Sequence, residues 1–110
     1  MSENPLLDTI IGINAVSLAN VDASLEAVLL VRLAALVAVD APPSSYLVTF
    51  RAAEGTLLEL EDARNVLIAV APIVGTPKVV NAAANIAQAL GLALAIDEAL
   101  LEAELEEDEA

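Results

Sequence analysis

Three residues near the middle of the chain have side chains that could act together on a small carboxylic acid. Arg32 is the only charged residue in the apolar run Ala27–Val39, Asp40 follows this run directly, and Tyr46 is the only tyrosine of the chain. A cofactor-free reaction on a small carboxylate needs a group that binds the anion and a group that donates a proton. Arg32 as the anion-binding group, Tyr46 as the proton donor, and Asp40 beside them are therefore the candidate catalytic residues.

Each of these residues also has a structural explanation. A buried arginine must be paired, and the sequence favours an ion pair for Arg32, within one chain or between subunits. Binding of a substrate carboxylate and exposure at the surface are the alternatives for the same side chain. A tyrosine in a helical bundle more often has a structural role, in which its ring packs in the core and its hydroxyl forms a hydrogen bond with a nearby group, and this is the alternative for Tyr46. The expected acidic partners of Arg32 are Glu26, Asp40, Glu61 and Asp62.

The chain contains no cysteine and no histidine among its 110 residues. It therefore has no disulfide, no zinc site built on thiolates and no thiol redox chemistry, and it lacks the commonest general base and metal ligand. Ser44 and Ser45 have no evident base, so capping of backbone donors is the simpler role for them. Glu102, Glu104 and Glu106 resemble a metal cluster only superficially, because carboxylate sites in bundles combine inward-facing glutamates with histidine. We expect no metal and no cofactor.

The composition is both apolar and acidic. Hydrophobic residue types make up 58% of the chain and aromatic residues only 2%, while 17 acidic and 4 basic residues give a net charge of -13. This charge repels phosphate groups, so nucleic acids and anionic membrane surfaces are not expected as partners. Such a large aliphatic surface must be shielded from water, and we therefore expect that several copies of the chain associate into a homo-oligomer.

Two further features of the sequence bear on its surroundings. The longest apolar run, Ala27–Val39, is interrupted by Arg32 and is too short to span a bilayer, which takes about 20 residues. The N-terminus has no basic segment followed by an apolar run, so the sequence predicts a soluble protein of the cytoplasm. Acidic residues are concentrated in Asp97–Glu109, where a solvated helix face is the simplest explanation and a site for a cation or a partner is the alternative.

Apolar periodicity, capping residues and prolines predict an all-α protein of five or six helices in a single domain, residues 1–110. Pro72 should kink the fourth helix or end it early, and Gly91 should separate the last two helices. Met1–Asn4 and Glu106–Ala110 are expected to be frayed. The predicted helices are Pro5–Asn20, about Ala23–Val39 with Asp22 as its cap, Pro43–Glu54, about Glu59–Val74, Pro77–Leu90 and Leu92–Leu105.

Four polar residues recur at intervals of three, four and three positions on the fifth predicted helix: Lys78, Asn81, Asn85 and Gln88. At about 100° per residue this spacing places them on one narrow strip. The strip is either the solvent-exposed face of that helix or a polar seam that lines a cavity or an oligomer axis.

Three stretches follow one another in the order VRLAALVAVDAPPSSYL (Val31–Leu47), VLIAVAPIVGTPKVV (Val66–Val80) and NAAANIAQALG (Asn81–Gly91). Together they resemble the carboxymuconolactone decarboxylase and alkylhydroperoxidase D-like family. The Ala-Pro-x-x-Gly-Thr-Pro run is the most specific part, since generic helical sequences rarely combine a proline within a helix with such a restart. The resemblance implies the compact, all-α alkylhydroperoxidase D-like fold and assembly into trimers or hexamers.

The chain departs from that family at its redox centre. The peroxidase branch carries Cys-x-x-Cys followed by histidine at the start of the helix after the central one, with a glutamate on the preceding helix. The matching window here, Asp40–Phe50, has neither residue type, and the glutamate position falls near Val28–Val31, which is apolar. A dithiol peroxidase needs a thiolate and a second, resolving thiol, so this chain cannot perform that reaction with its own residues. The pattern of the lactone decarboxylases is not matched either.

We therefore interpret the chain as a carboxymuconolactone decarboxylase-like homo-oligomer without a thiol peroxidase centre, mainly an assembly scaffold with room for a small-molecule pocket near Asp40–Phe50. The first alternative is a cofactor-free decarboxylase or lyase that acts on a small carboxylated compound through Arg32 and Tyr46. The second is an engineered or reconstructed helical scaffold. The absence of cysteine and histidine favours that origin, while the irregular Pro42-Pro43 and Pro72 oppose it.

Overall fold

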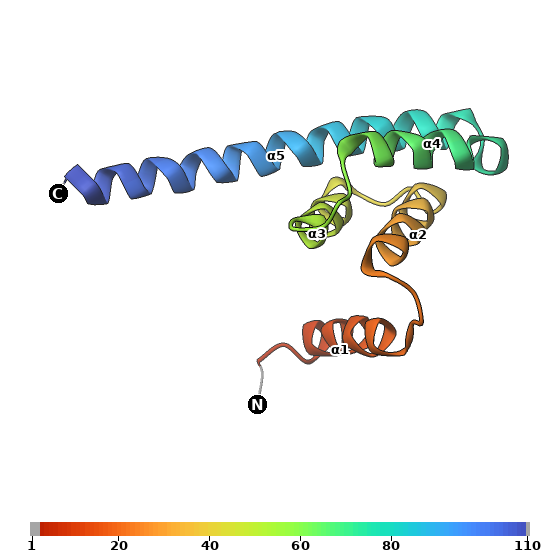
Figure 1. The fold of residues 1–110 in the computed structure, drawn as a ribbon, viewed down its shortest axis with the longest axis horizontal. Coiled ribbons are helices and arrows are strands. Elements are labelled where there is room, and N and C mark those ends of the chain that lie inside the picture. Colours follow the sequence, from red (N-terminus) through yellow and green to blue (C-terminus); the bar gives the residue numbers. More distant parts are fainter. Residues whose placement is uncertain (1–2, 110) are drawn as a thin grey trace.

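The computed structural model of the chain describes the backbone of residues 3–109 and the side chains of residues 3–91 and 97–105. The described backbone is all-helical and contains no strand, so the predicted all-α class is confirmed (Figure 1). Met1, Ser2 and Ala110, which the sequence predicts to be frayed, lie outside the described residues. The helices are α1 (Pro5–Asn20), α2 (Leu25–Ala38), α3 (Pro43–Ala53), α4 (Leu60–Val74) and α5 (Thr76–Glu109).

Short polar side chains define where the first two helices begin. The Oδ1 atom of Asn4 accepts a hydrogen bond from the backbone N of Leu7 at 3.0 Å, and Pro5 occupies the first position of α1. Ser24 caps α2 by accepting a hydrogen bond from the backbone N of Ala27 at 3.1 Å. The prediction that Asp22 caps this helix was therefore wrong, because a serine that can bind the third backbone N–H beyond it lies closer to the helix.

Proline and glycine separate α4 from α5. Pro72 lies in the last turn of α4, which continues to Val74, so the proline precedes the end of the helix by two residues. Gly75 then adopts a φ of 88°, a left-handed conformation that costs glycine little, and α5 begins at Thr76. The predicted stop and restart is thus present, one residue earlier than expected.

The last helix differs from the sequence prediction. Gly91 was expected to separate two helices, but α5 runs without interruption from Thr76 to Glu109, past the expected end at Leu105. A single glycine inside a helix costs only about 1 kcal/mol relative to alanine, and the flanking alanines and leucines are strong helix formers. A glycine without a neighbouring proline is therefore not enough to break this helix.

A compact body is formed by α2, α3, α4 and the N-terminal half of α5. The pair α2 and α3 packs against the pair α4 and α5, with contacts between α2 and α4 and between α3 and α5 (Figure 1). Small residues let the helices approach closely, and a few larger side chains fill the space between them. The buried cluster consists of Leu33, Val37, Ala41, Tyr46, Ala63, Ala82, Ile86 and Ala89.

The first helix stands apart from this body. Every residue of α1 is exposed, and its backbone makes no contact with another helix in the described part of the chain (Figure 1). The end of α5 also extends beyond the body, and the radius of gyration is 16.4 Å, against about 13 Å for a compact domain of this length. The compact bundle therefore comprises four helices, while α1 lies outside it.

None of the helices in residues 3–109 has both the length and the apolar composition needed to cross a membrane.

Candidate functional site

Arg32 lies on the side of α2 that faces α1. Its guanidinium donates hydrogen bonds to the Oδ1 atom of Asn14 and, at 3.1 Å, to the Oγ atom of Ser17, both on α1. No carboxylate of the described residues forms an ion pair with it. The predicted pairing of Arg32 with Glu26, Asp40, Glu61 or Asp62 is therefore wrong within one chain, because the side chain points toward the neutral acceptors of α1.

The same arginine borders an open groove between α1 and α2, with a volume of about 270 Å³. Its lining is apolar except for Arg32 and Ser17, and it includes Val21, Ala27, Val28 and Val31. Val31 is exposed, although valine is a residue that a folded protein usually covers. The groove thus combines an aliphatic wall with a cation that has only neutral partners.

Tyr46 lies on α3 in the centre of the body, where it is fully buried. Its ring centroid is 6.5 Å from that of Phe50, in a tilted arrangement. Its hydroxyl has no hydrogen-bond partner among the described residues. Burial, and to a smaller extent the negative charge of Asp40, raise the pKa of this hydroxyl above its ordinary value. A phenol in this environment stays protonated and could donate its proton only to a group that enters the core.

Asp40 occupies the turn between α2 and α3 and is the one non-glycine residue of the described backbone with a positive φ, 54°. Aspartate tolerates this left-handed conformation better than most residues. The turn is closed by a hydrogen bond from the backbone N of Ala41 to the carbonyl O of Leu36, at 3.0 Å. The Asp40 side chain is exposed, near enough to the Tyr46 hydroxyl to affect its pKa.

Two residues of the polar strip on α5 hold this turn in place. The Nζ atom of Lys78 donates a hydrogen bond to the carbonyl O of Ala38 at 2.7 Å, and the Nδ2 atom of Asn85 donates one to the carbonyl O of Ala41 at 3.3 Å. Lys78 and Asn85 are half-buried, whereas Asn81 and Gln88 are exposed. Two residues of the strip therefore form hydrogen bonds with the turn, and the other two lie on a solvent-exposed face.

Lys78 meets the C-terminal end of α2, where the unpaired carbonyls of the helix carry partial negative charge. A cation there satisfies one of those carbonyls and interacts favourably with the helix dipole. The spacing of Lys78 in the sequence places it on the polar strip but gives no indication of this partner. The last turn of α2 contains no basic residue of its own, and this is the feature of the sequence that could have suggested a cation from another helix.

The candidate catalytic residues fall into two separate places. Asp40 and Tyr46 lie near each other at the turn that Lys78 and Asn85 hold. Arg32 lines the groove between α1 and α2, and Tyr46 is not part of that lining. The structure therefore brings Asp40 together with Tyr46 and does not bring Arg32 to them.

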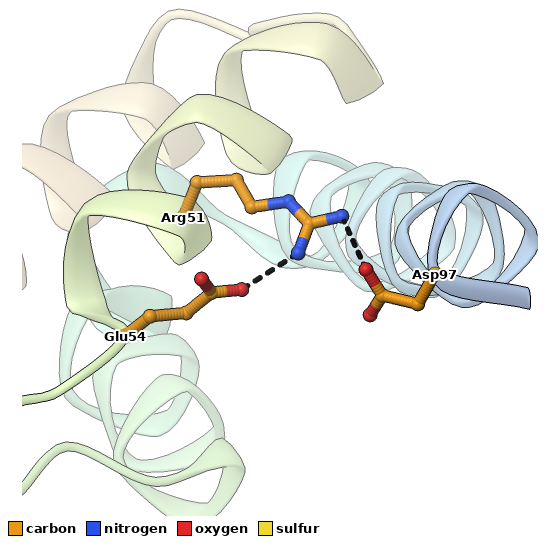
Figure 2. A network of polar contacts seen from close by, with 3 residues as sticks. All are labelled: Arg51, Glu54 and Asp97. Carbon is orange, nitrogen blue, oxygen red and sulfur yellow. Dashed lines mark hydrogen bonds and ion pairs between the residues drawn. The ribbon is translucent and has the colours of Figure 1, made fainter. Parts of the chain in front are cut away.

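An ion-pair network connects the end of α3 to α5 (Figure 2). Arg51, in the last turn of α3, contacts the Oε1 atom of Glu54 at 2.7 Å and the Oδ1 atom of Asp97 at 3.2 Å. These hydrogen bonds, above all the one that Arg51 donates to Glu54, raise the pKa of Arg51 above its ordinary value. All three side chains are partly or largely exposed, so the network contributes little to the stability of the fold.

No group of three or more metal-ligating side chains gathers anywhere in the described residues. This includes Glu102 and Glu104, while the side chain of Glu106 lies outside the described set.

No protein-family model matches this chain, and neither a curated protein nor a solved structure matches it. The likeness to the carboxymuconolactone decarboxylase family thus rests on the three sequence stretches quoted above.

Proposed function

We propose that this chain is the protomer of a homo-oligomer that serves mainly as an assembly scaffold, of the kind that its resemblance to carboxymuconolactone decarboxylase-like proteins implies. It works in the cytoplasm and has no thiol peroxidase centre. The observation that carries the proposal is α1, a helix whose residues are all exposed although most of them are aliphatic.

The physical argument concerns the stability of α1. Isolated helices of up to about 15 residues are marginal in water, and α1 has 16 residues and no backbone contact with the body. Burial of an apolar face is what normally stabilises such a helix. The exposed large residues of α1 are Leu6, Leu7, Ile10, Ile11, Ile13, Val16 and Leu18. Covering them with another subunit stabilises the helix and removes aliphatic surface from water.

The experiment is size-exclusion chromatography with light scattering on the full chain over a range of concentrations. We expect a single species of several subunits, three or six if the family resemblance holds. A monodisperse monomer at every concentration would contradict the proposal. A peroxide-reduction assay on the same material should give only the background rate, because the chain has no thiol.

A second candidate function, a cofactor-free lyase, is favoured by one observation. The Tyr46 hydroxyl is buried without a partner, and such groups are rare enough in native proteins to require an explanation. A small carboxylated substrate that entered beside Asp40 would give this hydroxyl an acceptor and receive its proton. The test is release of carbon dioxide from a panel of small carboxylic acids. Activity that Tyr46→Phe removes without changing the oligomer would support this candidate.

A further inference from the structure

We propose that the groove between α1 and α2 binds the C-terminal part of α5, around Leu101 and Leu105, from a second copy of this chain. This inference rests on the assembly function proposed above and identifies the two surfaces that meet. One is the groove bordered by Arg32, and the other is the exposed end of α5.

The groove offers an aliphatic wall beside a cation. Arg32 has two neutral hydrogen-bond partners on α1 and no carboxylate partner among the described residues. This is notable in a chain with 17 acidic and 4 basic residues, where carboxylates are abundant. The volume of about 270 Å³ is below the roughly 300–1,000 Å³ of typical small-molecule pockets, and it suits inserted aliphatic side chains better.

The end of α5 has the complementary pattern. Leu101 and Leu105 are one helical turn apart and both are more than half exposed. Glu98 and Glu102 are likewise one turn apart and exposed, and helical geometry places this acidic pair directly beside the leucine pair. An apolar stripe flanked by an acidic stripe fits an apolar groove flanked by an arginine. The leucines enter the groove, and Glu98 or Glu102 pairs with Arg32.

In a single folded chain, the groove and the end of α5 cannot contact each other. The backbones of α1 and α5 make no contact, and the C-terminal end of α5 extends past α3, away from the body (Figure 1). A second copy can supply the missing contact, either reciprocally in a two-fold pair or head to tail in a closed ring of three or more subunits.

The absence of cysteine makes thiol cross-linking the direct test, because an introduced cysteine is the only thiol. One preparation carries Val31→Cys at the groove and a second, larger by a purification tag, carries Leu105→Cys on α5. They are mixed and treated with a short bismaleimide. The matched control replaces the first with Val48→Cys on α3, since Val48 and Val31 are both 69% exposed. We expect cross-linked heterodimer in several-fold higher yield from the groove pair than from the control.

Charge reversal gives an independent readout. Arg32→Glu should weaken self-association about tenfold or more, because it sets a carboxylate against the acidic stripe. The double variant Glu98→Arg, Glu102→Arg should be weakened similarly. An equimolar mixture of the two variants should associate again, since each groove then meets an α5 end of opposite charge.

The outcomes separate this inference from the function on which it rests. If the unmodified chain is oligomeric but the groove pair cross-links no better than the control, or the mixed charge variants fail to associate, the inference is wrong and the scaffold function stands. If the unmodified chain is monomeric, both are wrong. Preferential cross-linking together with recovery in the mixture establishes the contact.

Discussion

Single residues around the turn between α2 and α3 act on its stability in opposite directions. The buried hydroxyl of Tyr46 has no partner, and a buried polar group in this state costs about 1–3 kcal/mol. Lys78 instead supplies a donor to a carbonyl at the end of α2. Each of these two features can be removed by a single substitution.

Tyr46→Phe keeps the buried ring and removes the hydroxyl. We expect the free energy of unfolding to stay the same or to rise by up to about 1 kcal/mol, because an unsatisfied polar group is lost. Tyr46→Ala, which also empties the space of the ring, should cost roughly 3 kcal/mol or more. Urea unfolding followed by circular dichroism measures both. A loss of more than about 1 kcal/mol in the phenylalanine variant would indicate that the hydroxyl has a partner after all.

The raised pKa of Tyr46 also makes stability depend on pH. In the unfolded chain the phenol ionises near its ordinary value of about 10, whereas in the folded chain it keeps its proton to higher pH. Above that value the folded state binds more protons than the unfolded state, so stability should fall as pH rises through the ordinary and then the raised pKa. Ultraviolet absorbance of tyrosinate reports Tyr46 alone, since it is the only tyrosine and the chain lacks tryptophan. Tyr46→Phe should remove this part of the alkaline dependence.

Lys78→Met should destabilise the protein by about 1–2 kcal/mol, because the carbonyl of Ala38 loses its donor and α2 loses a cation at its C-terminal end. Gln88→Met is the matched control from the same strip, because Gln88 is exposed, and it should change stability by less than about 0.5 kcal/mol. Thermal unfolding of the two variants compares them. Equal effects would mean that the contact of Lys78 with the turn contributes nothing.

Among the secondary-structure elements, whether a glycine or a proline ends a helix depends on its backbone conformation and its position. Gly75 has a positive φ and ends α4, whereas Gly91 lies within α5 and adopts no such conformation. Pro72 lies in the last turn of α4, where it cannot donate the backbone hydrogen bond to the carbonyl of Ile68, and the helix ends two residues later. The consequence is a single long helix that carries the acidic C-terminal segment beyond the body.

Gly91→Ala should stabilise the protein by about 0.5–1 kcal/mol, because alanine favours the helix and nothing lies within 4 Å of the added methyl group. Gly75→Ala should instead cost about 1 kcal/mol or more, because alanine is strained at a φ of 88°. Thermal unfolding of both variants measures the contrast. Destabilisation by Gly91→Ala would show that α5 is divided at that position, as the sequence predicts.

At the scale of the whole molecule, the fold consists of a four-helix body with two projections, α1 and the end of α5. Both projections expose aliphatic side chains, and both lie outside the buried cluster. The aliphatic surface exposed on both projections is the physical basis of the proposed scaffold function, in which other copies of the chain cover it.

Ile11→Asp places a charge on the exposed surface of α1 and should shift the assembly toward smaller species, because a carboxylate is costly to bury against another subunit. Unfolding of the body should change little, since α1 makes no backbone contact with it. Light scattering reports the assembly and circular dichroism the unfolding. An unchanged oligomer would show that the assembly does not cover this face of α1.

The class of the fold, most helix boundaries and the lack of thiol groups follow from the amino-acid sequence. The helix boundaries depend on local interactions, such as the prolines that begin α1 and α3 and the left-handed Gly75. The tertiary structure alone decided that Arg32 contacts neutral residues of α1, that Lys78 caps α2 from α5, and that Tyr46 lacks a partner. Each of these depends on which distant segments approach one another. Helix periodicity places a side chain on a face, but only packing determines what that face meets.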